Sequence, residues 1–374
     1  MSKTPAMAPV ISVNKVRRSF RSAQKGEGLK GTFELLLKPK FTDHHALKET
    51  TFTIEPGSFV GLIGANGAGK TTLLKILAGL IPPSSGEAKV LGFTPFDRTM
   101  EFRHAISLVM GQKAQLWWDL PATDAFDLLK AIYEIPEDKY RERLETLSEL
   151  LDVKRLLQTQ IRRLSLGERM KMELIGALLH WPKVIFLDEP TIGLDVLAAE
   201  KLRDFLKTFN QKEKATIILT SHNMDDIERL CSRVMILKSG EMIFDGSPNR
   251  LVREGECRLR IRLKETFDIP TLSQITGIAE ANITAVSEND DAEEDEDEKE
   301  ESADSTAGGA EGPATIPTFY FETTKEAVLK ILQALMGKGT VLDMGIEEQS
   351  LESVIQRIYA DGVVSDKGEA DVRV

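Results

Sequence analysis

The stretch GANGAGKTT, from Gly64 to Thr72, has the spacing of a phosphate-binding loop. The apolar run 59–63 before it predicts a buried strand, and residues 72–80 after it predict a helix. A glycine-rich loop between a strand and a helix is the context that distinguishes a true phosphate site from a chance match. We therefore expect the following residues to bind the phosphates of ATP: Gly64, Ala65, Asn66, Gly67, Ala68, Gly69, Lys70, Thr71 and Thr72.

Two side chains of this loop carry specific chemistry. Lys70 is expected to reach the outer phosphates, where its positive charge offsets theirs. The hydroxyl of Thr71 is expected to hold the magnesium ion that accompanies a triphosphate. The loop thus predicts ATP and Mg²⁺ as the ligands of this site.

A second motif, VIFLDEP, runs from Val184 to Pro190. Its apolar residues predict a buried strand, whose carboxyl end brings Asp188 and Glu189 to the edge of the sheet where ligands bind. We expect Asp188 to hold the magnesium through water, and Glu189 to act as the general base toward the water that attacks the γ-phosphate. An apolar strand that ends in two acids can also be an ordinary turn, but the phosphate loop upstream favours the catalytic interpretation.

A third motif, LSLGERMKMELIGALL, starts at Leu164. Ser165 stands three residues before Glu168, which is the pattern of a capping box and predicts a helix that begins here. The start of a helix exposes backbone amides and the positive end of its dipole, so it suits an anion. Taken alone, the pattern indicates only a well-capped helix.

Together these motifs resemble the ATP-binding subunits of ABC transporters, over residues 10–251. LSLGE is similar to the family signature LSGGQ, with Leu166 in place of Gly and Glu168 in place of Gln. The resemblance implies that Ser165, Gly167 and Glu168 contact the γ-phosphate held by a second subunit. It therefore implies a head-to-tail dimer with two ATP molecules, formed with a second copy or a related cassette.

Further residues match the family by position. Asp195, in the GLD sequence, matches the loop that communicates across the dimer, and His222, in TSHNMDD, matches the histidine that senses the γ-phosphate. Gln112, in VMGQKAQLWWDLP, matches the glutamine that links magnesium to the membrane partner. The resemblance also implies an aromatic residue that stacks on adenine, for which Phe20 is the best candidate.

Two segments near these motifs are open to two interpretations each. Trp117 and Trp118 suit a partner surface, since large amphipathic rings are enriched at interfaces, but they also suit the core of the helical insert. The insertion between Arg21 and His45 is basic and amphipathic, and it predicts either a surface loop or a contact with lipid headgroups or the permease. Both segments resemble an exporter-like branch of the family.

Strands and helices alternate after a β-rich start, which indicates an α/β fold. We predict a P-loop ABC cassette over residues 1–254, with a mixed sheet, an antiparallel β edge and a helical insert. The expected strands are 10–16, 46–54, 58–63, 88–90, 106–110, 184–187, 216–220 and 233–238. The expected helices are 122–131, 137–151, 166–180 and 198–210.

Residues 255–374 predict a small accessory α+β domain. Its elements are expected in the order βαβ, insert, βαβ and α, which is a split ferredoxin-like pattern. The expected segments are 257–263, 269–275, 282–286, 318–322, 324–336, 340–346 and 350–359. Regulation or support of a dimer and the binding of a ligand both remain open as roles for it.

An acidic insert accounts for the charge of the whole chain. Residues 288–304 contain twelve Asp or Glu and one Lys, and this segment alone carries the net charge of −11. Residues 288–315 are too polar and self-repelling to form a core, so we predict a disordered insert. A solvated spacer and a docking segment for a basic partner are both compatible with it.

The composition and the N-terminal residues bear on the cellular compartment of the protein. The chain has 374 residues and 41% hydrophobic residues, and it contains no run of about 18 apolar residues of the kind that spans a membrane. The start, MSKTPAMAPV, lacks the apolar core of a signal peptide. Cys231 and Cys257 form no metal-ligand spacing, and we expect both to be at least partly buried. We expect a cytoplasmic protein, peripheral on the cytoplasmic face of the cell membrane.

These observations favour the ATP-binding and ATP-hydrolysing subunit of an ABC transporter, an exporter in particular, with an integral-membrane permease as its partner. The alternative is a soluble ABC ATPase that acts on a ribosomal or nucleic-acid partner. Relatives of that kind carry two cassettes or long coiled coils, which this chain lacks, and its neutral body offers no basic face for nucleic acid. An ATP-binding scaffold without turnover is the least favoured, because Asp188, Glu189 and His222 are intact.

Overall fold

The structure is a computed structural model that describes residues 8–23, 41–111, 114–251, 256–286, 317–348 and 351–361. Its internal contacts divide the chain into two units, one of residues 1–248 and 358–374 and one of residues 249–357. Each unit has its own apolar core. Gln112, the acidic insert and residues 24–40 lie outside the described residues.

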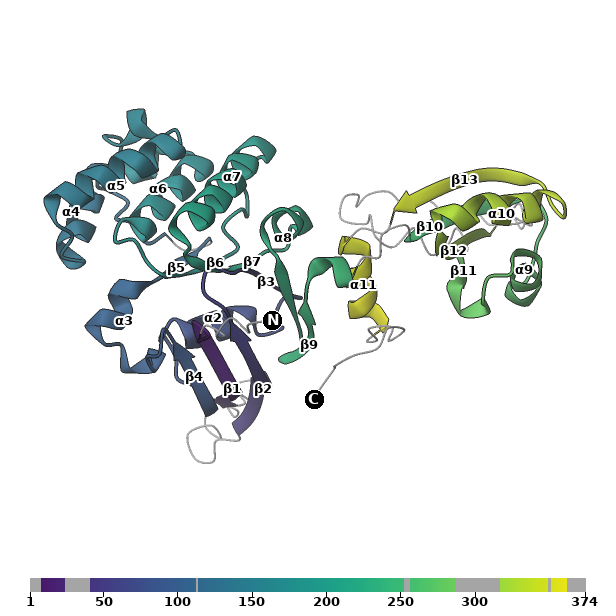
Figure 1. Cartoon of the computed structure of the whole chain (residues 1–374), viewed down its shortest axis with the longest axis horizontal. Helices are drawn as coiled ribbons and strands as arrows, with labels where there is room; N and C mark the ends of the chain where they lie inside the picture. The colour runs from purple at the N-terminus through teal and green to yellow at the C-terminus, as the bar shows by residue number, and fades with distance from the viewer. Residues whose placement is uncertain are drawn as a thin grey trace, which may run out of the picture. The chain divides into compact units, whose positions relative to one another are not determined.

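The main sheet of the first unit has the strand order β5-β6-β7-β3-β8-β9 (Figure 1). All neighbouring strands in it are parallel except β9, which pairs antiparallel with β8. Its central strands are buried runs of Val, Ile and Leu, as expected for a parallel sheet covered on both faces. The strands are β3 (Phe59–Gly64), β5 (Ile106–Met110), β6 (Val184–Asp188), β7 (Thr216–Thr220), β8 (Arg233–Lys238) and β9 (Glu241–Gly246).

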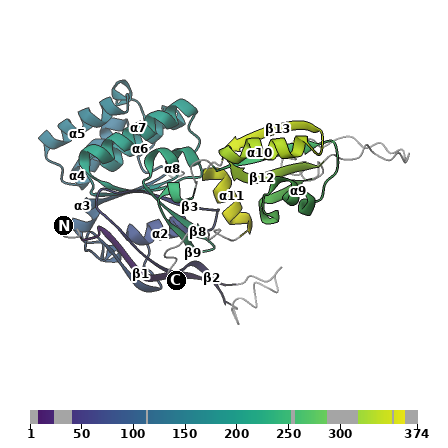
Figure 2. The ribbon, with the colours of Figure 1, turned by 45° about the vertical axis from the view of Figure 1, so that its right-hand side comes forward.

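A second, antiparallel sheet of this unit has the order β2-β1-β4. Its strands are β1 (Ile11–Ala23), β2 (Phe41–Ile54) and β4 (Ser85–Val90). Helix α2 (Lys70–Leu77) lies between the two sheets (Figure 2), and its apolar residues share one core with both. The phosphate loop is the link from β3 into this helix, so packing on both sides holds the helix that follows it.

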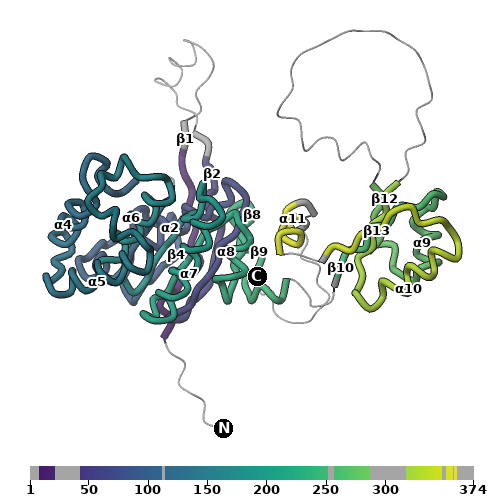
Figure 3. Tube along the Cα trace, turned by 90° about the horizontal axis from the view of Figure 1, so that it is seen from above, coloured from purple at the N-terminus to yellow at the C-terminus, as the bar shows by residue number. Residues whose placement is uncertain are grey.

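The remaining helices of the first unit surround the main sheet. Helices α4, α5 and α6 form the insert between β5 and β6, and Figure 3 shows them together at the side of the unit away from β8 and β9. This arrangement confirms the predicted cassette architecture. The helices are α3 (Met100–Ala105), α4 (Ala122–Ile132), α5 (Glu137–Leu150), α6 (Leu166–Leu178), α7 (Val196–Glu213) and α8 (Met224–Leu230).

The second unit is an antiparallel sheet with the order β11-β12-β10-β13. Two βαβ units that interleave in this way form the ferredoxin-like pattern predicted for this region. The elements are β10 (Glu256–Leu263), α9 (Ile269–Thr276), β11 (Ile283–Val286), β12 (Thr318–Thr324), α10 (Lys325–Met336) and β13 (Val341–Glu348). Helix α11 (Leu351–Asp361) follows β13 and crosses the boundary of the units in sequence.

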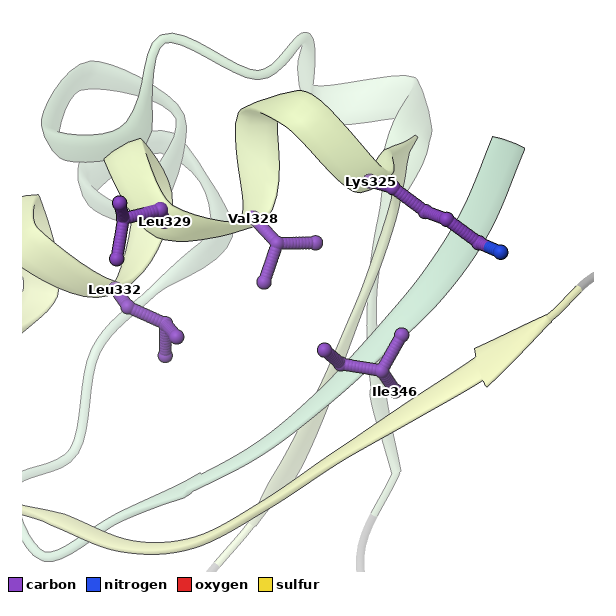
Figure 4. A pocket seen from close by; sticks show the side chains of 5 residues that line it. All are labelled: Lys325, Val328, Leu329, Leu332 and Ile346. Carbon is purple, nitrogen blue, oxygen red and sulfur yellow. The ribbon is translucent and has the colours of Figure 1, made fainter. Parts of the chain in front are cut away.

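Apolar residues alternate with arginines along β10, and the apolar ones form part of the core of this second unit. Its odd-numbered residues from Cys257 to Leu263 are buried in one core with residues of α9 and α10, so both helices cover the same face of the sheet. A pocket opens where α10 meets β13 (Figure 4). The side chains that line it are Lys325, Val328, Leu329, Leu332 and Ile346.

The elements differ from the predicted ones mainly at their ends. Strand β9 and helices α3 and α8 were not predicted, because each is short and has a weak apolar period. Strands β1 and β2 extend into the insertion between Arg21 and His45, so part of the expected loop is strand. Helix α7 begins at Val196, because the Asp195 carboxylate accepts a hydrogen bond from the amide of Ala198 and caps it.

Candidate functional site

The phosphate loop runs from the end of β3 to the start of α2. Gly69 precedes the helix with φ 107°, a left-handed conformation that favours glycine. A Cβ atom there would lie 2.4 Å from the carbonyl oxygen of Ala46 on β2, so no other residue fits. The amides of the first turn of α2 therefore face the loop, as a phosphate site requires.

Lys70 is buried at the start of α2. Its ammonium donates hydrogen bonds to the carbonyl oxygens of Gly64 at 2.5 Å and Ala65 at 3.3 Å, which hold it over the loop. Burial lowers the pKa of Lys70, and the charges of Glu189 and Asp188 partly offset that effect. The ammonium of Lys70 is therefore close enough to both predicted acidic residues of the site to be affected by their charges.

Asp188 stands at the carboxyl end of β6 and joins two neighbouring segments. Its Oδ2 accepts a hydrogen bond from the hydroxyl of Thr71 at 2.9 Å, and its Oδ1 accepts one from the hydroxyl of Thr220 at 2.7 Å. One carboxylate beside a hydroxyl is an oxygen donor set that suits Mg²⁺, which takes few protein ligands and its remaining ones from phosphate and water. Among the described residues, no group of three or more His, Cys, Asp or Glu is placed so that it could hold a metal ion.

Glu189 directly follows, in a strained conformation. Its φ of 55° is unusual for a residue with a side chain, and such strain gathers at functional sites. Its amide donates to Thr220 at the end of β7, and a Cβ atom on Gly111 would lie only 2.1 Å from its carbonyl oxygen. Contacts on both sides thus hold this conformation.

The carboxylate of Glu189 lies 2.9 Å from Nε2 of His222. A carboxylate only accepts hydrogen bonds, so this ring nitrogen carries the proton and donates. The two residues come from the segments after β6 and β7, which are neighbouring parallel strands. The predicted base and the predicted γ-phosphate sensor therefore lie side by side.

The signature segment begins α6 as predicted. The hydroxyl of Ser165 accepts from the amide of Glu168, whose carboxylate accepts from the amide of Ser165, and this completes the capping box. Leu166 packs against the segment before α7, since a Cβ atom on Gly193 would lie 2.7 Å from its Cδ2. Gly167 likewise faces Leu194 and Ala198. The signature thus contacts the region around Asp195 of its own chain.

The other predicted residues lie at the periphery. Phe20 is exposed near the end of β1, with the guanidinium of Arg18 stacked 4.5 Å from its ring centre. Trp117 and Trp118 are 44% and 49% exposed, so the alternative that places them in a core is wrong. Cys231 and Cys257 are both buried, as expected. Among the described helices, none has the length and apolar character that would let it cross a membrane.

Two further residues, Thr220 and Asp226, complete the site and are not among the residues predicted from the sequence. Thr220 contacts both Asp188 and Glu189, and Asp226 joins the segments around Glu189 and His222. Thr220 had a usable signal, because it is polar and ends an apolar strand at the edge where ligands bind. The sequence around Asp226 gives no such signal, because the residues that donate hydrogen bonds to it are 5 to 35 residues away in sequence.

Comparisons with known proteins agree with this geometry. A family model described as ABC transporter matches residues 47–192. The ABC transporter ATP-binding protein NatA of Bacillus subtilis is 33% identical over 202 residues, which cover 54% of this chain and 82% of NatA. The probable multidrug ABC transporter ATP-binding protein YbhF of Escherichia coli K12 is 31% identical over 215 residues, 58% of this chain but only 37% of YbhF.

Solved structures show the same cassette. The cbiO1 protein of Clostridium perfringens, described as part of the ABC transporter complex cbiONQ, matches with a TM-score of 0.53 and 25% identity, over 65% of this chain and 90% of that one. The ATP-binding cassette MJ0796, in a dimeric structure with ADP and Pi, matches at 0.53 and 24% identity, over 63% and 98%. Because its identity is only 24%, the likeness to MJ0796 shows a shared fold and nothing more.

The fold and the strand-end cluster define a nucleotide-binding ATPase of the P-loop class. The chain belongs to the family of ABC transporter ATP-binding proteins. It binds ATP and is an ATPase.

Proposed function

We propose that this chain powers an ABC exporter as one of two cassettes that close over two ATP molecules and move a membrane permease. The observation that carries the proposal is the Glu189–His222 pair at 2.9 Å, beside Asp188 and Lys70. Groups of this kind at neighbouring strand ends can hold a triphosphate, position a water and stabilise the γ-phosphate during transfer. A damaged catalytic set would instead have favoured a scaffold.

Within one cassette the roles follow from position. The loop amides and Lys70 hold the phosphates, and Thr71 and Asp188, with Gln112, would hold Mg²⁺, whose charge would neutralise that of the phosphates. Glu189 acts as the base toward the attacking water. Since Nε2 of His222 donates to Glu189 in this structure, the same N–H is placed to orient that carboxylate before ATP binds and to donate to a γ-phosphate oxygen in its stead once the triphosphate is bound. Phe20 stacks on the adenine.

The dimer supplies the remaining half of each site. Ser165, Gly167 and Glu168 begin a capped helix, and its positive end meets the γ-phosphate held by the other cassette. Asp195 caps α7 next to them and transmits the state of one site to the other. Val196 and Leu197 are 80% and 71% exposed beside this segment, and such exposed apolar residues suit a subunit interface.

The permease contacts the surface around Trp117 and Trp118, in this proposal. Large exposed rings are typical anchors of protein interfaces, and they follow Gln112 closely in sequence. The carboxylate of Glu173 on α6 accepts from the amides of Gln115 and Leu116, so the signature helix holds this loop. Export is the direction we favour, and the name of the E. coli relative refers to probable multidrug transport.

We propose two domains, a cassette over residues 1–254 and an accessory domain over residues 255–374, whose role is regulation or support of the dimer. The protein is expected on the cytoplasmic face of the cell membrane, where its permease would hold it. The acidic insert is expected to be a solvated spacer in the central connection of the accessory domain.

A tagged purification tests the proposal. The Glu189→Gln chain, purified with ATP in mild detergent from its native cell, should retain the closed dimer and its partners. Mass spectrometry should identify one or two proteins with many membrane spans, and these should be absent with the Lys70→Ala chain, which lacks the phosphate contact. Ribosomal or DNA-bound partners in their place would favour a soluble ABC factor and overturn the transporter proposal.

A further inference from the structure

A buried charge cluster lies behind the Glu189–His222 pair. Asp226, in the first turn of α8, has 0% of its side chain exposed, and Arg203 on α7 has 6%. Oδ1 of Asp226 accepts from Nε of Arg203 at 2.6 Å, and Oδ2 accepts from the hydroxyls of Thr191 at 2.5 Å and Ser221 at 2.6 Å. Both carboxylate oxygens are therefore used inside the protein.

The two hydroxyl donors occupy informative positions. Thr191 stands two residues after Glu189, and Ser221 stands immediately before His222. The hydroxyl of Ser221 also accepts a hydrogen bond from the amide of Asn223. This bond joins the residues on either side of His222 and closes a turn around it. A single carboxylate thus joins the segment that carries the proposed base to the segment that carries the proposed γ-phosphate sensor.

Arg203, the third donor to Asp226, connects this carboxylate to the helix that begins at the proposed dimer interface. Arg203 lies on α7, the helix that Asp195 caps, and it contacts Asp226 with charge-assisted geometry. A buried ion pair costs free energy to desolvate, and it stabilises its surroundings only when its hydrogen bonds are complete. Here they come from three separate segments, so a shift of any one of them weakens contacts to the other two.

We propose that Asp226 is a positioning residue for ATP hydrolysis, which sets the distance between Glu189 and His222, with Arg203 as its fixed counter-charge. This inference rests on the proposed roles of Glu189 and His222. A positioning residue acts on the chemical step, because a displacement of about 1 Å in a catalytic group can cost about 100-fold in rate. It leaves the phosphate loop, and hence the affinity for ATP, largely unchanged.

The experiment compares Asp226→Asn with Asp225→Asn in the purified full chain. Asp225 is the neighbouring residue of the same helix and is exposed, so its substitution controls for a lost charge on α8. For Asp226→Asn we expect kcat to fall about 10- to 100-fold, with KM changed by less than about threefold. The affinity for a fluorescent ATP analogue should match the wild type, and Asp225→Asn should match it in every respect.

Milder variants keep the test decisive if Asp226→Asn unfolds the chain. Thr191→Val and Ser221→Ala each remove one hydroxyl and leave the charge pair intact. Each should lower kcat by about threefold to tenfold without lowering affinity for the ATP analogue. Their effects should be non-additive in the double variant, since both act through one carboxylate. Thermal unfolding measured alongside separates this result from simple loss of fold.

The outcomes distinguish this inference from the proposed function. If Glu189→Gln and the Asp226 and hydroxyl variants all lose turnover with affinity retained, both stand. If Glu189→Gln loses turnover while the folded Asp226 and hydroxyl variants keep wild-type kcat, Asp226 has only a structural role. If Glu189→Gln itself keeps wild-type turnover, the assignment of the base is wrong and the positioning role fails with it.

Discussion

The two units of the chain differ in what they bury. Every buried polar or charged side chain of the described residues lies in the first unit, from Thr50 to Asp226. The described core of the second unit is apolar. Burying a polar group costs free energy unless hydrogen bonds compensate it, so a protein retains such groups where they have a further use. The contrast therefore locates chemistry in the cassette.

Exposed apolar residues do not separate the units, because both leave some on their surfaces, Val196 and Leu197 among them in the first unit. In the second unit Leu329 on α10 and Ile346 on β13 are exposed and line the pocket between these two elements (Figure 4). The alternation of apolar and polar residues along its strands is thus enough to predict the fold of this unit, although none of its motifs points to a catalysed reaction. In this chain the catalytic prediction depends on motifs, and the motifs all lie in the cassette.

The largest expected effect tests whether turnover depends on the cassette alone. Glu189→Gln removes the proposed base while keeping the shape of the side chain, and kcat should fall about 100-fold or more. Glu326→Gln makes the same change at an exposed position in the first turn of α10, and it should leave kcat unchanged. Steady-state phosphate release measures both. Equal losses in the two variants would break the contrast between the units.

Affinity for ATP should depend on the buried ammonium of the phosphate loop. Lys70→Ala removes a charge-assisted contact to phosphate, so the dissociation constant of ATP should rise about 10- to 100-fold. Lys75→Ala removes the same charge from the last turn of α2, away from the loop, and should have little effect. Equilibrium binding of a fluorescent analogue measures both variants. An unchanged affinity in Lys70→Ala would contradict the assignment of the loop.

The sequence predicts this site well because its motifs are local. Gly69, Lys70 and Thr71 are fixed by one strand-loop-helix segment, and Asp188 and Glu189 by the end of one strand. In a parallel sheet the carboxyl ends of neighbouring strands meet at one edge, so separate motifs come together predictably. The strands β5 and β7, whose predicted bounds match the structure, are short and largely apolar runs of the same sheet.

Other features depend on tertiary contacts and could not be predicted. The left-handed conformation of Glu189 follows from its hydrogen bonds to Thr220 and from the close approach of Gly111. The role of Asp226 requires α7, α8 and two loops to be in place at once. Single-sequence patterns describe one segment at a time, so a junction of this kind leaves no local signal.

Acid sensitivity should also reside in the cassette, because it buries a titratable histidine. Burial lowers the pKa of His180 to about 4, while its ring stacks on Tyr133 with centroids 4.0 Å apart. A folded pKa below the unfolded value of 6.5 means stability that is present above pH 6.5 and lost as the pH falls toward 4. Between pH 7 and 4.5 the wild type should lose about 2 kcal/mol through this group.

The variant His180→Phe isolates that contribution. It keeps an aromatic ring against Tyr133 but cannot take up a proton, so its free energy of unfolding should fall about 2 kcal/mol less than that of the wild type over this pH range. His44→Gln changes an exposed histidine on β2 and should behave as the wild type. Urea titrations at the two pH values provide the comparison. Parallel pH profiles for wild type and His180→Phe would show that His180 does not titrate as proposed.

The smallest expected effect tests whether the units unfold separately. Ile261 is fully buried in the second unit, and Ile261→Val should destabilise that unit by about 0.5–1.5 kcal/mol. All three tryptophans, at positions 117, 118 and 181, lie in the first unit, so Trp fluorescence reports the cassette, whereas far-UV circular dichroism reports both units. Ile261→Val should shift only the unfolding transition measured by circular dichroism. Ile218→Val, at a buried position of β7, should shift the unfolding transition measured by fluorescence. A common shift in both signals for Ile261→Val would mean that the units unfold together, and that the cassette's stability depends on a unit without catalytic motifs.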